Sequence, residues 1–126
     1  MERIRDKKMI LVVDDDMKHL LTAKDLLEDM GYEVRMHQFA FGVTNVVREA
    51  QPDLILLDMN MPGLSGEKLS KVLLSNGRTK DVPIVFYSSN DEDSLRRAVT
   101  EHGVKGYISK GDIFDLRKKV AEYLAV

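Results

Sequence analysis

Hydrophobic residues gather in five short runs along the chain, each with the length of a β-strand. β-branched and aromatic residues are prominent in most of these runs, which is typical of strands. The first, third and fourth runs are almost continuously apolar and predict central strands buried on both faces, whereas the second alternates and fits a sheet edge. The runs are Met9–Val13, Glu33–His37, Leu54–Leu57, Ile84–Tyr87 and Lys105–Ser109.

The segments between and after these runs carry apolar stripes at helical spacing. Gly31, Gly77 and Gly103 follow three of the stripes, where we expect left-handed C-terminal caps, and Pro52 should end the second helix. The stripes are Leu20, Ala23, Leu27, Met30; Val43, Val46, Val47, Ala50; Leu69, Val72, Leu73; Leu95, Ala98, Val99; and Leu116, Val120, Tyr123, Leu124.

Strand and helix thus alternate five times. This order predicts an α/β fold in which parallel strands are joined by right-handed crossovers and helices cover both faces of the sheet, a doubly wound three-layer sandwich. A chain of 126 residues has the size of one domain, and no linker or repeat divides it. We therefore expect a single domain over residues 1–126.

Composition narrows the function classes. The net charge of -2 favours neither nucleic acid nor an anionic membrane as a partner. The chain has no cysteine, which excludes disulfides and thiolate chemistry, and its apolar runs are far shorter than the roughly 20 residues of a membrane span. The charged segment Met1–Lys8 does not resemble a secretory signal, so a cytoplasmic location is expected.

Polar residues capable of chemistry follow four of the predicted strands. In an open parallel sheet, ligands bind outside the carboxyl ends of the strands, so these side chains should converge on one edge. They are Asp14, Asp15 and Asp16 after the first strand, Asp58 after the third, Ser88 and Ser89 after the fourth, and Lys110 after the fifth.

The acids Asp14, Asp15 and Asp58 would repel one another unless a cation neutralised them. Mg²⁺ prefers oxygen ligands and commonly uses one or two carboxylates together with a phosphate oxygen. A carboxylate can attack phosphorus and form an aspartyl phosphate, and transfer of this kind needs mainly positioning and charge neutralisation. The pattern indicates a magnesium-dependent phosphoacceptor.

Four motifs, each at a strand end, resemble the receiver domain of two-component response regulators, the CheY-like family, over nearly the whole chain. The resemblance implies a flavodoxin-like fold with strand order 2-1-3-4-5. It also implies signalling rather than metabolic catalysis, with a sensor histidine kinase or histidine phosphotransfer protein as phosphodonor. The motifs are residues 10–16, 53–66, 82–89 and 106–110.

The resemblance also implies a role for each site residue. Asp58 would be the phosphoacceptor; Asp15 and Asp58 would bind Mg²⁺ directly, Asp14 largely through water, and Asn60 through its carbonyl. Ser88 and Lys110 would contact the phosphoryl group, and Tyr107 would rotate inward as Ser88 moves. A downstream effector would bind the Asp93–Tyr123 face, and because no DNA-binding segment follows, any effector is expected to be separate or missing.

One position departs from the family. Gly111 stands where the family usually has a proline, often after a cis peptide bond. A cis bond without proline costs about 2.5–4 kcal/mol, so either strain is retained or the loop takes another path. The position of the Lys110 ammonium therefore depends on the conformation of this loop.

Several of these residues also have structural interpretations. Asp16 is expected to cap the helix that starts near Met17, and Ser89 to satisfy local backbone groups. Tyr107 fits a half-buried aromatic of an edge strand as well as a switch. The three histidines, His19, His37 and His102, and the run Arg117–Lys119 are expected on the surface, away from the acidic edge.

Three functions compete. The first is the phosphorylation switch at Asp58, and the second is a receiver-like interaction module that is not phosphorylated, which Gly111 alone favours. The third is a phosphatase of the haloacid-dehalogenase type, whose nucleophile would be Asp14 or Asp16. Lys18 stands where that family has Thr or Val, and its domains are usually longer, so the sequence favours the switch.

Overall fold

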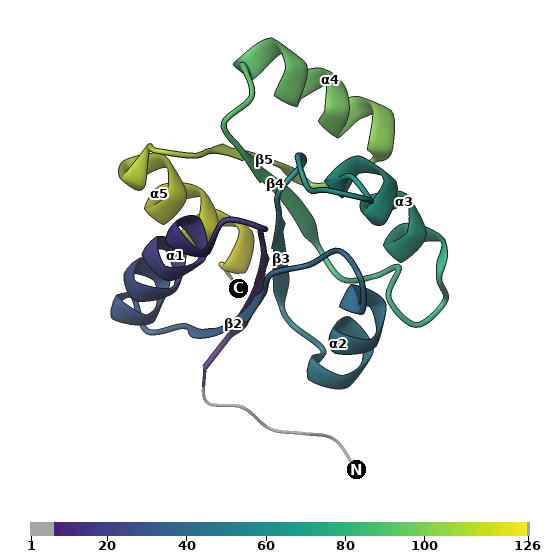
Figure 1. Ribbon diagram of the computed structural model, residues 1–126. Coiled ribbons are helices and arrows are strands. Elements are labelled where there is room, and N and C mark those ends of the chain that lie inside the picture. The colour runs from purple at the N-terminus through teal and green to yellow at the C-terminus, as the bar shows by residue number, and fades with distance from the viewer. Residues whose placement is uncertain (1–6, 126) are drawn as a thin grey trace.

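The computed structural model describes residues 7–125 and confirms the predicted alternation of strands and helices (Figure 1). Residues 1–6 and 126 of the predicted domain, and with them most of the Met1–Lys8 segment, lie outside the described residues. No helix in the described part is long and apolar enough to cross a bilayer. The elements are β1 Met9–Val13, α1 Met17–Asp29, β2 Glu33–His37, α2 Val43–Ala50, β3 Leu54–Leu57, α3 Gly66–Ser75, β4 Ile84–Ser88, α4 Glu92–His102, β5 Gly106–Ser109 and α5 Ile113–Leu124.

The five strands form one parallel sheet in the order β2-β1-β3-β4-β5, which confirms the predicted fold and topology. In the register, Val13 of β1 lies opposite Leu57 of β3, and Leu57 lies opposite Phe86 of β4. Strands β1 and β3 therefore end level with one another, and β4 continues two residues further, to Ser88. The segment that follows Leu57 therefore leaves the sheet at the middle of its carboxyl-terminal edge.

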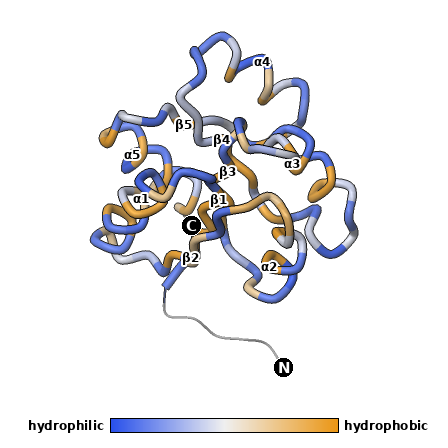
Figure 2. Tube along the Cα trace, viewed as in Figure 1, coloured by the Kyte–Doolittle hydropathy of each residue, from blue (hydrophilic) through white to orange (hydrophobic). Residues whose placement is uncertain are grey.

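Helices α1 and α5 cover one face of the sheet, and α2, α3 and α4 cover the other (Figure 1). Side chains of a strand alternate between the two faces, so Ile55 and Leu57 join the core under α2, α3 and α4, while Leu54 and Leu56 join the core under α1 and α5. Figure 2 shows the hydrophobic central strands β1 and β3 inside a shell of mixed helices. The edge strand β2 buries only Val34, as its alternating pattern predicts.

Two of the three predicted glycine caps are correct. Gly31 and Gly103 have φ of 98° and 69°, in the left-handed region. The prediction for Gly77 is wrong, because α3 ends at Asn76 in an extended conformation and Gly77 has no positive φ. The Asn76 side chain accepts a hydrogen bond from the Arg78 backbone at 2.9 Å, so a local side-chain turn replaces the glycine cap.

Candidate functional site

Asp58 leaves the sheet at the end of β3 and is almost fully buried, with 4% of its surface exposed. Its backbone N–H donates to the Val13 carbonyl at 2.9 Å, which extends the strand pairing to this residue. Gly66, the first residue of α3, packs against it so closely that a Cβ at Gly66 would lie 1.9 Å from the Asp58 carbonyl oxygen. The loop after β3 thus folds back tightly and fixes the Asp58 backbone.

The two acids after β1 lie beside Asp58. Asp14 is fully buried, and its Oδ1 accepts a hydrogen bond from the Asp16 backbone at 2.9 Å, whereas Asp15 is exposed at the rim. One carboxylate oxygen from each of Asp14, Asp15 and Asp58 lies within 4.8 Å of the other two. The predicted gathering of the three acids is present. Asp16, in contrast, caps α1 by accepting from the Lys18 backbone, as predicted.

Lys110 reaches into this acidic pocket. Its Nζ lies 2.5 Å from Asp14 Oδ2 and 3.4 Å from Asp58 Oδ1, and its side chain is only 7% exposed. The described residues contain no cis peptide bond, and Gly111 has a φ of 86°. The loop therefore takes another path, through a left-handed glycine, and Lys110 still contacts both buried acids.

The charges in the pocket are only partly balanced. Burial raises the pKa of the Asp58 carboxyl to about 6; Lys110 opposes this shift and Asp14 adds to it. Asp14 Oδ2 accepts no hydrogen bond from the described residues, although it is ion-paired with Lys110. One ammonium thus faces two buried carboxylates and a third at the rim.

This donor set fits a hard divalent cation. Three carboxylate oxygens lie close to one another, and protein groups neutralise their charge only in part. Mg²⁺ takes oxygen ligands of this kind in proteins. Asn60 is exposed beside them, its N–H donating to Asp58 Oδ1 at 3.3 Å and its Nδ2 to Asn90 Oδ1 at 2.8 Å. The use of its carbonyl as a ligand stays a prediction.

The two predicted switch residues differ in their surroundings. Ser88 is fully buried at the end of β4, and its Oγ accepts a hydrogen bond from the Asn90 backbone at 3.2 Å; Ser89 is exposed. Tyr107 is half-buried on β5, with its hydroxyl bonded to Glu92 of α4 and its ring 4.1 Å from the Lys119 ammonium of α5. Tyr107 therefore occupies the outer face between these helices.

Sequence reasoning missed His19 as a neighbour of the pocket. Its side chain is 43% exposed, but its Nδ1 lies 3.2 Å from Lys110 Nζ and 3.6 Å from Asp14 Oδ2. His19 follows the cap residue Asp16 by three positions, so the first turn of α1 turns it back toward the strand end. The expectation that His19 stands away from the acidic edge is wrong.

Other surface expectations also need correction. The side chain of His102 is only 18% exposed, and its Nε2 bonds to Glu67 at 2.7 Å across two helices. His37 ends β2, and its Nε2 lies 2.8 Å from the Phe41 carbonyl. Lys119 is half-buried against Tyr107, whereas Arg117 and Lys118 are exposed as predicted. Only tertiary packing determines these contacts.

Known proteins share this architecture. The sequence profile of the response regulator receiver domain matches residues 10–121. The polar-differentiation response regulator DivK of Brucella anthropi is 30% identical over 107 residues, covering 82% of this chain and 84% of DivK. The chemotaxis protein CheY4 of Vibrio cholerae is 24% identical with a TM-score of 0.85, covering 94% of this chain and 99% of CheY4.

A further structure is the receiver domain of the sensor histidine kinase PA1611 from Pseudomonas aeruginosa, which holds a magnesium ion in its active-site cleft. It is 20% identical with a TM-score of 0.84, covering 95% of this chain and 99% of that domain. The profile match spans most of the chain, and the fold and the strand-end acids agree with it. The chain belongs to the response regulator receiver domain family.

Proposed function

We propose that this protein is a phosphorylation switch that accepts a phosphoryl group on Asp58 from a phosphohistidine donor in the presence of Mg²⁺. The observation that supports this most directly is the buried Asp58 carboxylate, whose oxygens lie beside those of Asp14 and Asp15 and beside the Lys110 ammonium. A metabolic activity is not expected, because receiver domains are signalling domains.

The proposed transfer uses few groups. An Asp58 oxygen attacks phosphorus in line; the new O–P bond forms as the donor's P–N bond breaks, and the donor imidazole leaves with the electron pair. Asp58 Oδ1 already accepts from Asn60 and faces Lys110, whereas no hydrogen bond or ion pair of the described residues engages Oδ2. We assign the attack to Oδ2.

Mg²⁺, held by Asp14, Asp15, Asp58 and Asn60, would neutralise the phosphoryl oxygens. Two groups of the chain would also balance the negative charge of the phosphoryl group. Lys110 supplies a buried ammonium, and the Ser88 hydroxyl, which among the described residues accepts from the Asn90 backbone and donates to no group, can donate its proton to a phosphoryl oxygen.

Switching is proposed to run through Ser88 and Tyr107. A hydrogen bond from Ser88 to the phosphoryl group would vacate space at the end of β4, and Tyr107 on the neighbouring strand would move inward. The pairing of Ser88 with Ser109 and of Phe86 with Tyr107 links the two strands through which such a movement passes. The effector would then read the Asp93–Tyr123 face.

We propose that the donor protein approaches across an apolar rim. A cavity of about 640 Å³ adjoins Asp15 and is lined by apolar residues that include Phe39, Phe41 and Leu64. Phe41 is 93% exposed and Phe39 is 66% exposed. Large apolar side chains exposed next to a reacting group support contact with a partner protein, here the kinase or phosphotransfer protein.

The alternatives predict different labels. We propose to incubate the protein with Mg²⁺ and a small phosphodonor and to map the phosphoryl group by mass spectrometry. The switch requires label on Asp58 that disappears in Asp58→Asn and after chelation of the metal. An interaction module would remain unlabelled at saturating donor, and a phosphatase would carry its label on Asp14 or Asp16.

A further inference from the structure

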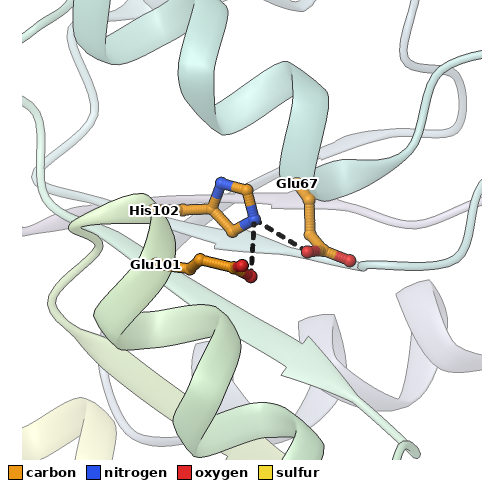
Figure 3. A group of neighbouring side chains, drawn as sticks. All are labelled: Glu67, Glu101 and His102. Atoms are coloured by element: carbon orange, nitrogen blue, oxygen red, sulfur yellow. Dashed lines mark hydrogen bonds and ion pairs between the residues drawn. The ribbon is translucent and has the colours of Figure 1, made fainter.

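We propose a second metal site in this protein, formed by Glu67, Glu101 and His102, for a divalent transition ion such as Zn²⁺. Glu67 lies in the first turn of α3, and the other two residues form the end of α4 (Figure 3). One donor atom from each residue lies within 4.8 Å of the other two. None of the three belongs to the proposed phosphoacceptor site, so this inference does not rest on it.

The imidazole of His102 is the centre of the cluster. Its Nε2 lies 2.7 Å from Glu67 Oε2 and 3.8 Å from Glu101 Oε2, and Figure 3 shows both carboxylates on this nitrogen's side of the ring. The ring packs edge-on against Phe86 of β4, with centroids 6.3 Å apart. This core contact fixes the ring and directs Nε2 toward the carboxylates.

Within its ion pairs the cluster carries more negative charge than the imidazole neutralises, and Arg96 and Arg97, which line the adjoining cavity, form no ion pair with Glu67 or Glu101. Both carboxylates are paired with the same imidazole, and no lysine or arginine among residues 7–125 forms an ion pair with either. A protonated His102 would offset one charge of two. A divalent cation would offset both.

The donor types select the ion. Imidazole nitrogen with carboxylate oxygen suits Zn²⁺ and its neighbours, whereas Mg²⁺ prefers oxygen ligands alone. Zinc–ligand bonds of about 2.0–2.2 Å in a tetrahedron place neighbouring donors roughly 3.4 Å apart. The two distances at His102 lie on either side of this value, so small side-chain rotations suffice. Binding displaces the proton from Nε2 to solvent.

The site has room for a fourth ligand. Glu67 and Glu101 line an open cavity of about 670 Å³ between α3 and α4, which would admit a water molecule to complete the tetrahedron. A bound ion would join the start of α3 to the end of α4. The chain would then carry two chemically distinct sites, an all-oxygen site for Mg²⁺ and a mixed site for a transition ion.

The test is a titration of the whole protein with Co²⁺ and then Zn²⁺ in excess Mg²⁺, followed by Co²⁺ absorption, by the imidazole NMR signals and by thermal melting. We expect one equivalent of Co²⁺ to bind with tetrahedral absorption, Zn²⁺ to displace it and raise Tm, and the His102 signals to shift. His102→Gln should abolish all of these effects.

Two sets of variants complete the test. Glu67→Gln and Glu101→Gln, which leave the His102 ring packing intact, should each weaken binding. His37→Gln should leave it unchanged. His19→Gln tests the acidic pocket as the competing zinc site. Absence of Co²⁺ uptake, an unchanged titration in His102→Gln, or loss of binding in His19→Gln with retention in His102→Gln would overturn the proposal.

Discussion

The hydroxyl of Tyr107 donates a 2.7 Å hydrogen bond to Glu92, and this contact holds the aromatic ring on the outer surface between α4 and α5. Arg96 lies 3.4 Å from the same carboxylate, and the Lys119 ammonium stacks on the ring from α5. The proposed inward movement of Tyr107 must break the bond to Glu92. Glu92 therefore sets part of the balance between the two positions of the ring.

Glu92→Ala should favour the inward position of Tyr107. A single exposed hydrogen bond of this kind is worth about 1 kcal/mol, which corresponds to roughly a fivefold change in the ratio of the two positions. NMR of ¹³C-labelled tyrosine would measure the ratio. Glu92→Gln keeps an acceptor and should restore the outer position, and Asp93→Asn, which touches Arg96 but not Tyr107, should have no effect.

Gly66→Ala should destabilise the fold by about 3 kcal/mol, because the new Cβ collides with the backbone of Asp58 rather than with a flexible side chain. Urea denaturation would measure the free energy of unfolding. The matched control is Gly77→Ala, where a Cβ meets nothing within 4 Å and where φ is not positive. That variant should lie within about 0.5 kcal/mol of the parent, and equal losses for the two would contradict the packing argument.

Asp58→Asn should stabilise the metal-free protein at pH 7 by about 1–2 kcal/mol, a value reduced for solvent screening. The folded pKa of about 6 exceeds the ordinary aspartate value of 3.8, mainly through burial, with Lys110 opposing the shift and Asp14 reinforcing it. The folded state then holds the Asp58 proton more tightly than the unfolded state. Stability from this group is present below pH 3.8 and is lost as the pH rises through about 6.

The measurement for Asp58 is urea denaturation of the parent and the variant from pH 4 to pH 7 with a chelator present. The difference between them should be small at pH 4 and largest at pH 7, and excess Mg²⁺ should reduce it at pH 7. A difference that does not change with pH would show that the Asp58 charge carries no cost in the folded state.

Phe41→Ala should slow phosphoryl transfer from the protein donor while leaving labelling by a small phosphodonor unchanged. Loss of an aromatic anchor at an interface commonly costs 1–2 kcal/mol, or about tenfold in kcat/KM. Because Phe41 is 93% exposed, its truncation should not disturb the fold. Val72→Ala, on the exposed side of α3, is the control, and equal slowing with both donors would contradict a docking role.

The sequence predicts the sheet and its acidic edge well, because strand periodicity and strand ends are local properties. Asp14, Asp15 and Asp58 are brought together by parallel topology alone, which the alternation of strands and helices already implies. The outer position of Tyr107 depends on residues of α4 and α5, and the bond from His102 to Glu67 joins residues 35 apart in the chain. No periodicity encodes such contacts.

Lys110 is a second example, because here the sequence suggests a difficulty that the structure does not have. The family resemblance predicts that Gly111 hinders the placement of Lys110 in the pocket. In the structure, Gly111 adopts a left-handed conformation and Lys110 contacts the buried acids. The fit between Gly66 and Asp58 is likewise invisible in the sequence, where a glycine at the start of a helix is only a weak helix former.

The ion pair between Lys110 and Asp14 makes the lysine a built-in competitor of the proposed Mg²⁺ for the Asp14 carboxylate. The ammonium is tethered to the fold and lies 2.5 Å from the carboxylate, so its effective concentration is fixed by geometry and does not vary with the surroundings. Under the proposed function, Mg²⁺ would have to displace this ammonium from Asp14 rather than bind an unpaired carboxylate. The readiness of Asp58 to accept a phosphoryl group would then depend on a threshold concentration of free magnesium, and the strength of one lysine–aspartate contact would determine where that threshold lies.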